Sequence, residues 1–335
     1  MTQTSEYTRM NALPSIIKRQ CALCMCEKPI SEFNVEHIFL DAIGGALTCQ
    51  DLCTVCNSQL GEGHDSRLAN HALVRLTCTA FKIRGKNHGI PNPFRNSQAT
   101  TADGHPVRVT VDRQTGMFGM EIVQRVAKSR STTPDGRPVT HVRVTVDSKN
   151  KADAVDITNK ILRKQGLPAK SAEDLEPLMR RSPAGAAHAS LSMSLDDFVP
   201  SLLKTAYLLA LRWLGPSYLT DPMADKIRSL LIIENPDESD YTRLGILGEA
   251  DMATMDDREE LTALGVQPHE HMGVLVSTPN GILVNVYIFQ VLVAKFWVSQ
   301  DSGRYGKAST HFVFLDAIER QVREQIFLHG LPQRP

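Results

Sequence analysis

Two pairs of closely spaced cysteines constrain this chain more than any other feature of its sequence. Cys21 and Cys24 form one Cys-x-x-Cys pair, and Cys53 and Cys56 form a second. Two such pairs can place four thiolates around one cation, in the tetrahedral geometry that Zn²⁺ prefers. Four protein ligands leave no open position on the metal. We therefore expect a structural zinc, which contributes folding free energy to a small unit.

The remaining cysteines fit the same interpretation. Cys26 and Cys49 lie near the two pairs and are alternative zinc ligands. Cys78 lies in an apolar run and is expected to pack as a small buried side chain. Six of the seven cysteines fall between residues 21 and 56, a clustering that indicates metal binding rather than a disulfide framework spread through a secreted chain.

The chain as a whole has the composition of a globular protein, with 335 residues, 42% of them hydrophobic and 22% charged. This length is sufficient for two domains. The 37 basic and 37 acidic residues cancel, so any surface that binds nucleic acid must gather its basic side chains locally. The first ten residues lack the apolar segment of a signal peptide, and no stretch is apolar over the roughly 20 residues that a membrane span needs. We expect a cytoplasmic protein without a membrane partner.

Residues 96–335 predict a mixed α+β region. Polar and apolar residues alternate at 105–112 and 139–146. The sequence VRVTVD occurs at 107–112 and again at 142–147, which indicates two strands paired in one sheet. Residues 273–298 contain the turn signal Asn280-Gly281 and are expected to form a β-hairpin. Helical spacing predicts a helix over residues 152–165, and helices are also expected over residues 171–181, 195–214, 222–233, 254–264 and 314–328. The helix at 195–214 is expected to belong to the core.

The candidate catalytic and metal-binding residues lie between and after the cysteine pairs. In chain order they are Glu36-His37, Gly44-Gly45, Asn57 directly after Cys56, Leu60-Gly61 and His64-Asp65. Over about residues 20–75 this ordered set resembles the HNH endonuclease family, in its treble-clef zinc branch. The resemblance implies a ββα-metal nuclease unit. The expected fold class is therefore α+β, with this N-terminal zinc unit followed by a larger mixed α+β domain.

The resemblance also implies a role for each residue of the site. His37 corresponds to the general base, because a neutral imidazole can take a proton from water near pH 7. Glu36 corresponds to a ligand of the catalytic metal, and Asn57 holds the backbone or the base imidazole in position. Asp65 by register, or His64 beside it, supplies the last metal ligand. Glu36 with Asp65 suits Mg²⁺ or Mn²⁺, whereas binding by His64 would favour Ni²⁺ or Zn²⁺.

Basic side chains near this unit are candidates for contacts to the phosphate backbone of DNA. They are Arg67, Arg75, Lys82, Arg84 and Lys86. The alternative is an ordinary solvated surface. Binding through such contacts would be largely independent of DNA sequence and sensitive to salt.

These observations predict two domains and leave three hypotheses for function. Residues 1–95 are expected to form an HNH nuclease domain with a structural zinc, and residues 96–335 a domain for recognition, regulation or assembly. The leading hypothesis is a metal-dependent endonuclease that nicks or cuts DNA. The second is a non-catalytic, zinc-stabilised protein that binds nucleic acid or supports assembly. The third is an effector, as in anti-phage defence or a restriction-like system, whose C-terminal domain gates the nuclease through a protein partner or a ligand.

Overall fold

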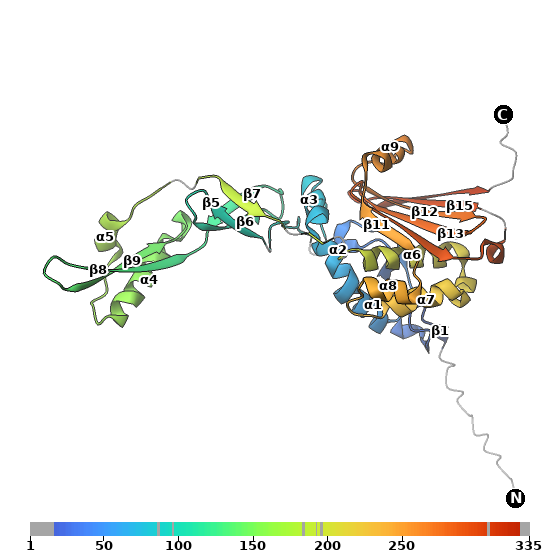
Figure 1. The fold of residues 1–335 in the computed structure, drawn as a ribbon, viewed down its shortest axis with the longest axis horizontal. Coiled ribbons are helices and arrows are strands. Elements are labelled where there is room, and N and C mark those ends of the chain that lie inside the picture. The colour runs from blue at the N-terminus through green and yellow to red at the C-terminus, as the bar shows by residue number, and fades with distance from the viewer. Residues whose placement is uncertain are drawn as a thin grey trace, which may run out of the picture. The chain divides into compact units, whose positions relative to one another are not determined.

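The chain divides into two compact units in the computed structural model, which describes residues 17–85, 88–95, 97–182, 185–191, 193–194, 197–306 and 309–328 (Figure 1). Unit 1 joins residues 1–69 to residues 195–335, and unit 2 comprises residues 70–194. The compact units therefore run differently along the chain from the expected domains 1–95 and 96–335, which as functional divisions remain a prediction. The fold is mixed α+β, as expected.

The N-terminal part of unit 1 consists of short elements around the cysteine pairs. Strands β1 (Lys18–Gln20) and β2 (Glu27–Pro29) flank the first pair, and β3 (Glu36–His37) pairs with β4 (Thr48–Cys49). Helix α1 (Thr54–Leu60) begins inside the second pair. It continues through a π-helical turn, η3 (Gly61–Asp65), into α2 (Ser66–Asn70).

A six-stranded antiparallel sheet forms most of the rest of unit 1, in the order β11-β14-β13-β12-β15-β16. Its strands are β11 (Gly248–Met252), β12 (Glu270–Thr278), β13 (Gly281–Ile288), β14 (Leu292–Ser299), β15 (Ser309–Asp316) and β16 (Gln321–Leu328). The expected hairpin at 273–298 is confirmed for β12 and β13, and the same stretch also contains most of β14.

The predicted closing helix at 314–328 is wrong, because this stretch holds the end of β15, a turn and β16. The carboxylate of Asp316 accepts hydrogen bonds from the backbone N–H groups of Ile318 and Glu319, and Arg320 adopts a left-handed φ of 54°. This local turn reverses the chain where the sequence pattern alone was compatible with a helix.

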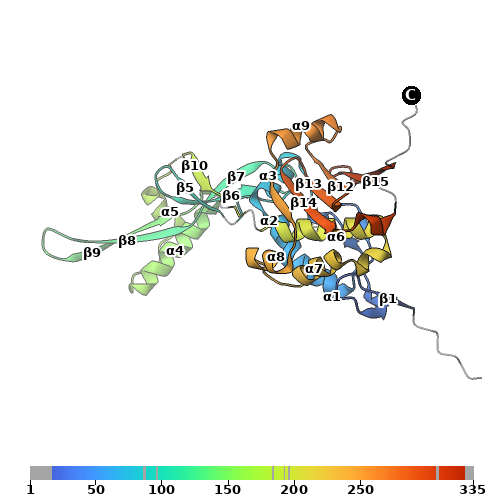
Figure 2. The ribbon, with the colours of Figure 1, turned by 45° about the vertical axis from the view of Figure 1, so that its right-hand side comes forward.

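Four helices complete the described part of unit 1: α6 (Val199–Leu214), α7 (Pro222–Leu231), α8 (Glu238–Leu244) and α9 (Met255–Ala263). They confirm the predicted helices at 222–233 and 254–264, and the one at 195–214, of which residues 195 and 196 lie outside the described residues. Helix α6 packs against β12, β13 and β14 (Figure 2). Its residues from Pro200 to Leu211 are all buried, as expected of a core helix.

The N-terminal elements share the core of this sheet and α6. The ring of Phe39 stacks on the imidazole of His271 from β12, with ring centroids 5.6 Å apart. Gly44 has a φ of 92° and lies so close to Ala317 that a Cβ atom would come within 2.4 Å of the Ala317 carbonyl oxygen. Gly44 is therefore needed where this loop meets the chain after β15, and a Cβ atom on Gly45 would collide with the Phe39 carbonyl oxygen.

Unit 2 contains a four-stranded sheet in the order β10-β5-β6-β7 and a separate two-stranded ribbon, β8-β9. Its strands are β5 (Gln98–Thr101), β6 (Pro106–Val111), β7 (Phe118–Ile122), β8 (Arg125–Thr132), β9 (Pro138–Thr145) and β10 (Ala187–Ser190). Its helices are α3 (Ala72–Ala80), α4 (Lys151–Lys164) and α5 (Ala172–Leu175). The predicted helix at 152–165 is confirmed, and the one at 171–181 is shorter than expected.

The two copies of VRVTVD do not pair, which corrects the expectation of two strands in one sheet. The first lies mainly in β6, between β5 and β7, and the second mainly in β9, which pairs with β8. Each strand pairs with neighbours along the chain, because a short connection closes at the lowest entropic cost. None of the helices in the described ranges is both long and apolar enough to span a membrane.

Candidate zinc site and candidate active site

The four cysteines of the two predicted pairs come together. The sulfur atoms of Cys21, Cys24, Cys53 and Cys56 all lie within 4.8 Å of one another. A hydrogen bond from the Cys56 thiol lowers the pKa of Cys21 to about 4, whereas burial raises the pKa of Cys24 to about 11. Four sulfurs at this spacing cannot all ionise unless a cation compensates their charge. The donor set therefore fits Zn²⁺ with four protein ligands, which is the structural type of zinc site.

The neighbouring cysteines lie outside this cluster. Cys26 is exposed, and its thiol donates to the backbone carbonyl of Cys24. Cys49 lies on β4 opposite Glu36. Cys78 is buried in α3 of unit 2, as expected of a small apolar side chain, and burial raises its pKa to about 12. Within the described ranges, only the four clustered cysteines make a group of three or more potential metal ligands.

The Glu36-His37 pair lies on β3, and α1 fixes the chain that leads into it. The side-chain amide of Asn57 donates to Asn34 Oδ1 at 2.8 Å and to the backbone carbonyl of Val35 at 3.1 Å. Glu36 is 6% exposed, whereas His37, the next residue along the strand, is only half-buried. Asn57 thus contacts the backbone, which is one of the two contacts that the resemblance implies. Its catalytic role remains a prediction, as does that of His37.

Lys204 from α6 joins Glu36 and Asp65 in a buried ion-pair triad. Its Nζ lies 2.5 Å from Glu36 Oε1 and 2.7 Å from Asp65 Oδ2, and donates to the backbone carbonyl of His37 at 3.2 Å. The hydroxyl of Ser201 donates to the other oxygen of Asp65 at 2.8 Å. The lysine side chain is 1% exposed. The sequence predicts that the two carboxylates share one site, but it does not predict the ammonium between them.

The triad has one more negative group than positive groups. Burial alone would lower the pKa of Lys204, but the carboxylates of Asp65 and Glu36 outweigh it and raise that pKa, so the lysine stays protonated. Burial raises the pKa of Glu36, and the Lys204 ammonium opposes this shift. One oxygen of each carboxylate is bonded to Nζ, and the ammonium lies between the two groups that would have to share a divalent cation. The arrangement therefore does not fit a divalent cation at Glu36 and Asp65 while Lys204 holds this position.

His64 does not join this cluster. It is buried, and its Nε2 lies 3.0 Å from the backbone carbonyl of Leu231 at the end of α7. Burial lowers the pKa of His64, which favours the neutral ring at this position. Of the two residues left open by the sequence, Asp65 is the one that the structure places beside Glu36.

The predicted phosphate-binding residues lie in different environments. Arg67 is half-buried and donates to the backbone carbonyl of Glu234 at 3.4 Å. Arg75 is buried and donates to Asn70 Oδ1 and to the carbonyl of Asn92, so its guanidinium is not presented to a phosphate group. Lys82 and Arg84 are exposed in unit 2, and Lys86 lies outside the described residues.

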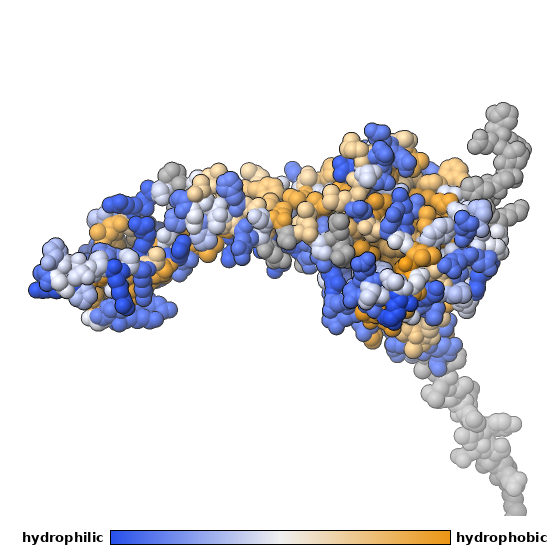
Figure 3. Space-filling view, in the orientation of Figure 1, coloured by the Kyte–Doolittle hydropathy of each residue, from blue (hydrophilic) through white to orange (hydrophobic). Residues whose placement is uncertain are grey.

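A stronger basic surface lies on the β8-β9 ribbon, outside the predicted phosphate-binding residues. Between residues 123 and 146 the only acidic residue is Asp135. The basic residues of this stretch are Arg125, Lys128, Arg130, Arg137 and Arg143, and all five are exposed. The surface of this part of unit 2 is largely hydrophilic (Figure 3). The local charge was visible in the sequence but was hidden in the zero net charge of the whole chain.

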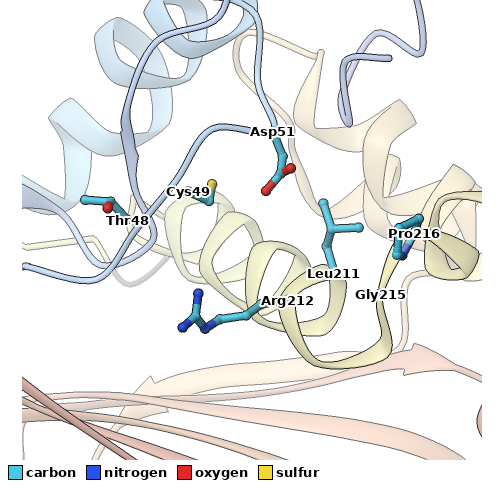
Figure 4. A pocket seen from close by; sticks show the side chains of 7 residues that line it. All are labelled: Thr48, Cys49, Asp51, Leu211, Arg212, Gly215 and Pro216. Atoms are coloured by element: carbon cyan, nitrogen blue, oxygen red, sulfur yellow. The ribbon is translucent and has the colours of Figure 1, made fainter. Parts of the chain in front are cut away.

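A shallow pocket in unit 1 lies between the loop around β4 and the end of α6 (Figure 4). It is lined by Thr48, Cys49, Asp51, Leu211, Arg212, Gly215 and Pro216. Of these residues, only Cys49 is a candidate metal ligand from the sequence, and it lies outside the four-cysteine cluster. Arg212 already binds Glu324 through two hydrogen bonds, so the pocket offers no free cation from this side chain.

Comparison with known proteins locates one family within the chain. No curated protein and no solved structure matches the chain. Residues 21–73, the segment that carries the four cysteines, Glu36, His37, Asn57 and Asp65, match the model of the family described as HNH endonuclease.

Proposed function

We propose that this chain is an HNH-type nuclease that hydrolyses phosphodiester bonds in DNA, with His37 as the general base. The observation that carries the proposal is the family match over residues 21–73, together with the placement of its residues. The four clustered cysteines lie close together, and Glu36 and His37 both lie on β3. Asn57 donates a hydrogen bond to the backbone carbonyl of Val35, directly before them.

The chemistry proposed for His37 needs a neutral ring that reaches a water molecule beside the scissile phosphate. An imidazole can accept the proton of that water near neutral pH, and such general bases contribute about 10²–10⁴-fold to rate. Asn57 keeps the backbone before His37 in place through its bond to the carbonyl of Val35. Because Lys204 occupies the position between Glu36 and Asp65, we assign no step to a metal there, and the predicted Mg²⁺, Mn²⁺, Ni²⁺ or Zn²⁺ remains a prediction.

The basic β8-β9 ribbon supports duplex DNA as the substrate. A two-stranded ribbon has dimensions that the major groove of B-DNA admits, whereas the major groove of an RNA helix is deep and narrow. Residues 123–146 contain no Phe, Tyr or Trp, so the ribbon lacks the stacking side chains typical of proteins that bind single strands. Exposed Arg and Lys side chains suit contacts to the phosphate backbone.

A second candidate function is a non-catalytic protein that uses its zinc unit to bind nucleic acid or to support assembly. The buried Lys204 triad favours this alternative, because it neutralises the carboxylates that an active HNH site would use to hold a metal. The two candidates differ in one measurable property, which is cleavage of DNA that depends on His37.

The test compares cleavage of supercoiled plasmid by the wild type, His37→Ala and the control His188→Ala, which removes an exposed imidazole on β10. Reactions contain Mg²⁺, Mn²⁺ or EDTA, and the zinc content of each protein is measured. We expect cleavage by the wild type and the control, and a loss of about 10² or more in His37→Ala at unchanged zinc content. Equal cleavage by His37→Ala would refute the assignment of the base, and absence of any cleavage would favour the second candidate.

A further inference from the structure

We infer that Lys204 is the resident cation of the HNH site and that its ammonium excludes divalent metal from Glu36 and Asp65 in the resting protein. This inference rests on the proposed function only in that the site is of the HNH type. It concerns the binding of metal and not the cleavage of DNA.

The position of the ammonium coincides with the position that a bridging metal would take. A magnesium ion lies about 2.0–2.1 Å from carboxylate oxygens. Nζ of Lys204 lies 2.5 Å and 2.7 Å from one oxygen of each carboxylate. A metal ion and the ammonium cannot occupy this space together. Two cations this close would also repel each other. A metal that bridges these two oxygens therefore requires Nζ to leave.

The surroundings show that Lys204 is built into the site. Ser201, Lys204 and Thr205 lie at helical spacing i, i+3 and i+4 on α6, so they face the same side. Ser201 donates to Asp65, and Thr205 donates to the backbone carbonyl of Ile38 at 3.0 Å. All three side chains are buried. In an otherwise largely apolar helix, these three polar side chains bond Asp65 and the segment from Glu36 to Ile38.

Withdrawal of Lys204 would be difficult without movement of α6. The side chain is 1% exposed, and the helix around it packs on β12, β13 and β14. The buried ammonium cannot reach solvent by rotation of its side chain alone. Its removal would leave two carboxylates without a counter-charge. The resting chain is therefore expected to hold its structural zinc and to bind no Mn²⁺ at Glu36 and Asp65.

The test titrates Mn²⁺ into the zinc-loaded full chain and detects bound Mn²⁺ by electron paramagnetic resonance. We expect no specific site in the wild type. Lys204→Met keeps the length of the side chain and removes the charge, and we expect it to bind Mn²⁺ at least 100-fold more tightly than the wild type. The matched control is Lys204→Met combined with Glu36→Gln and Asp65→Asn, which removes the carboxylates and should bind no Mn²⁺.

Each result decides the inference. A wild-type Mn²⁺ site that Glu36→Gln abolishes would overturn it, and so would a folded Lys204→Met that binds no Mn²⁺. If Lys204→Met alone proves insoluble, Lys204→Gln, which removes the charge but keeps a hydrogen-bond donor beside the two carboxylates, replaces it in the same comparison. A protein that never cleaves DNA can still pass this test, so failure of the proposed nuclease activity and failure of this inference are distinguishable.

Discussion

His271 is a buried imidazole whose two nitrogens both have partners, and the partner of Nδ1 requires the neutral ring. Its Nε2 lies 3.0 Å from the backbone carbonyl of Ile43, to which it can donate, and its Nδ1 accepts the backbone N–H of Phe289 at 3.3 Å. Burial lowers its pKa to about 4. A protonated ring would lose the bond from Phe289 and would carry a charge among Phe39 and Phe289.

This environment predicts a loss of stability in acid. In the unfolded chain His271 has a pKa of about 6.5, so between pH 6.5 and pH 4 the unfolded state binds the extra proton. Its contribution to stability is complete above pH 6.5 and falls as the pH drops toward 4. The loss between pH 7.5 and pH 5 is about 2 kcal/mol. Chemical denaturation of the wild type and His271→Gln at both pH values measures it. An equal acid loss in both proteins would show that another group is responsible.

The spacing of residues along the sequence predicts part of the candidate site but not all of it. The sequence places Glu36, His37, Asn57 and Asp65 in one unit, and the structure brings Asp65 to Glu36 and Asn57 to the chain before β3. The spacing could not predict Lys204, because the ammonium comes from a helix far along the chain. The available signal was a lysine within an apolar helical run, since a buried lysine requires partners of opposite charge.

At the scale of elements, the β8-β9 ribbon should make most of the electrostatic contact with DNA. The triple variant Arg125→Gln, Lys128→Gln, Arg130→Gln removes three exposed cations from β8. If each contacts one phosphate, the slope of log K against log salt concentration should become shallower by about 3. Fluorescence anisotropy with a labelled duplex at several salt concentrations measures this slope.

A matched variant on the same unit controls for net charge. Lys160→Gln, Arg163→Gln, Lys164→Gln removes three exposed cations from the end of α4. It should leave the salt slope close to that of the wild type. If the two triple variants bind duplex DNA equally well, the ribbon is an ordinary solvated surface and the DNA contacts lie elsewhere.

Some of the helices and strands could be predicted from the sequence, and others could not. The helices at 152–165 and 222–233 were predictable because their apolar residues have helical spacing and their ends carry clear terminal residues, such as Gly166 and Asp221. The helix at 254–264 has little such spacing, and its clearest signal is Thr254, whose side chain accepts a hydrogen bond at the helix N-terminus. The strands β15 and β16 were not, because one side chain, Asp316, folds the intervening turn. Neither the pairing of β6 and β9 nor the sheet order could follow from alternation alone, since alternation specifies a face and not a partner.

At the scale of the molecule, unit 1 is assembled from two distant stretches of chain. Side chains from α6 and β12 bond backbone carbonyls in the N-terminal stretch: Tyr207 bonds Ala22, Thr205 bonds Ile38, and His271 bonds Ile43. These carbonyls lie in loops and short elements that lack a complete set of partners of their own. The zinc unit and the six-stranded sheet therefore stabilise each other, and damage to the zinc site should spread through unit 1.

This coupling predicts that a zinc ligand matters more for folding than the proposed catalytic base does. Cys53→Ser removes one of the four clustered thiols at the start of α1, whereas His37→Ala alters a half-buried side chain outside the cluster. Zinc binding in small zinc units contributes about 10 kcal/mol or more to folding, so Cys53→Ser should lose its zinc and most of its soluble yield. Cys26→Ser removes an exposed thiol outside the cluster and should behave as the wild type. Metal analysis and thermal unfolding of the three variants make the comparison, and equal zinc content and equal thermal stability in Cys53→Ser and Cys26→Ser would contradict a structural zinc.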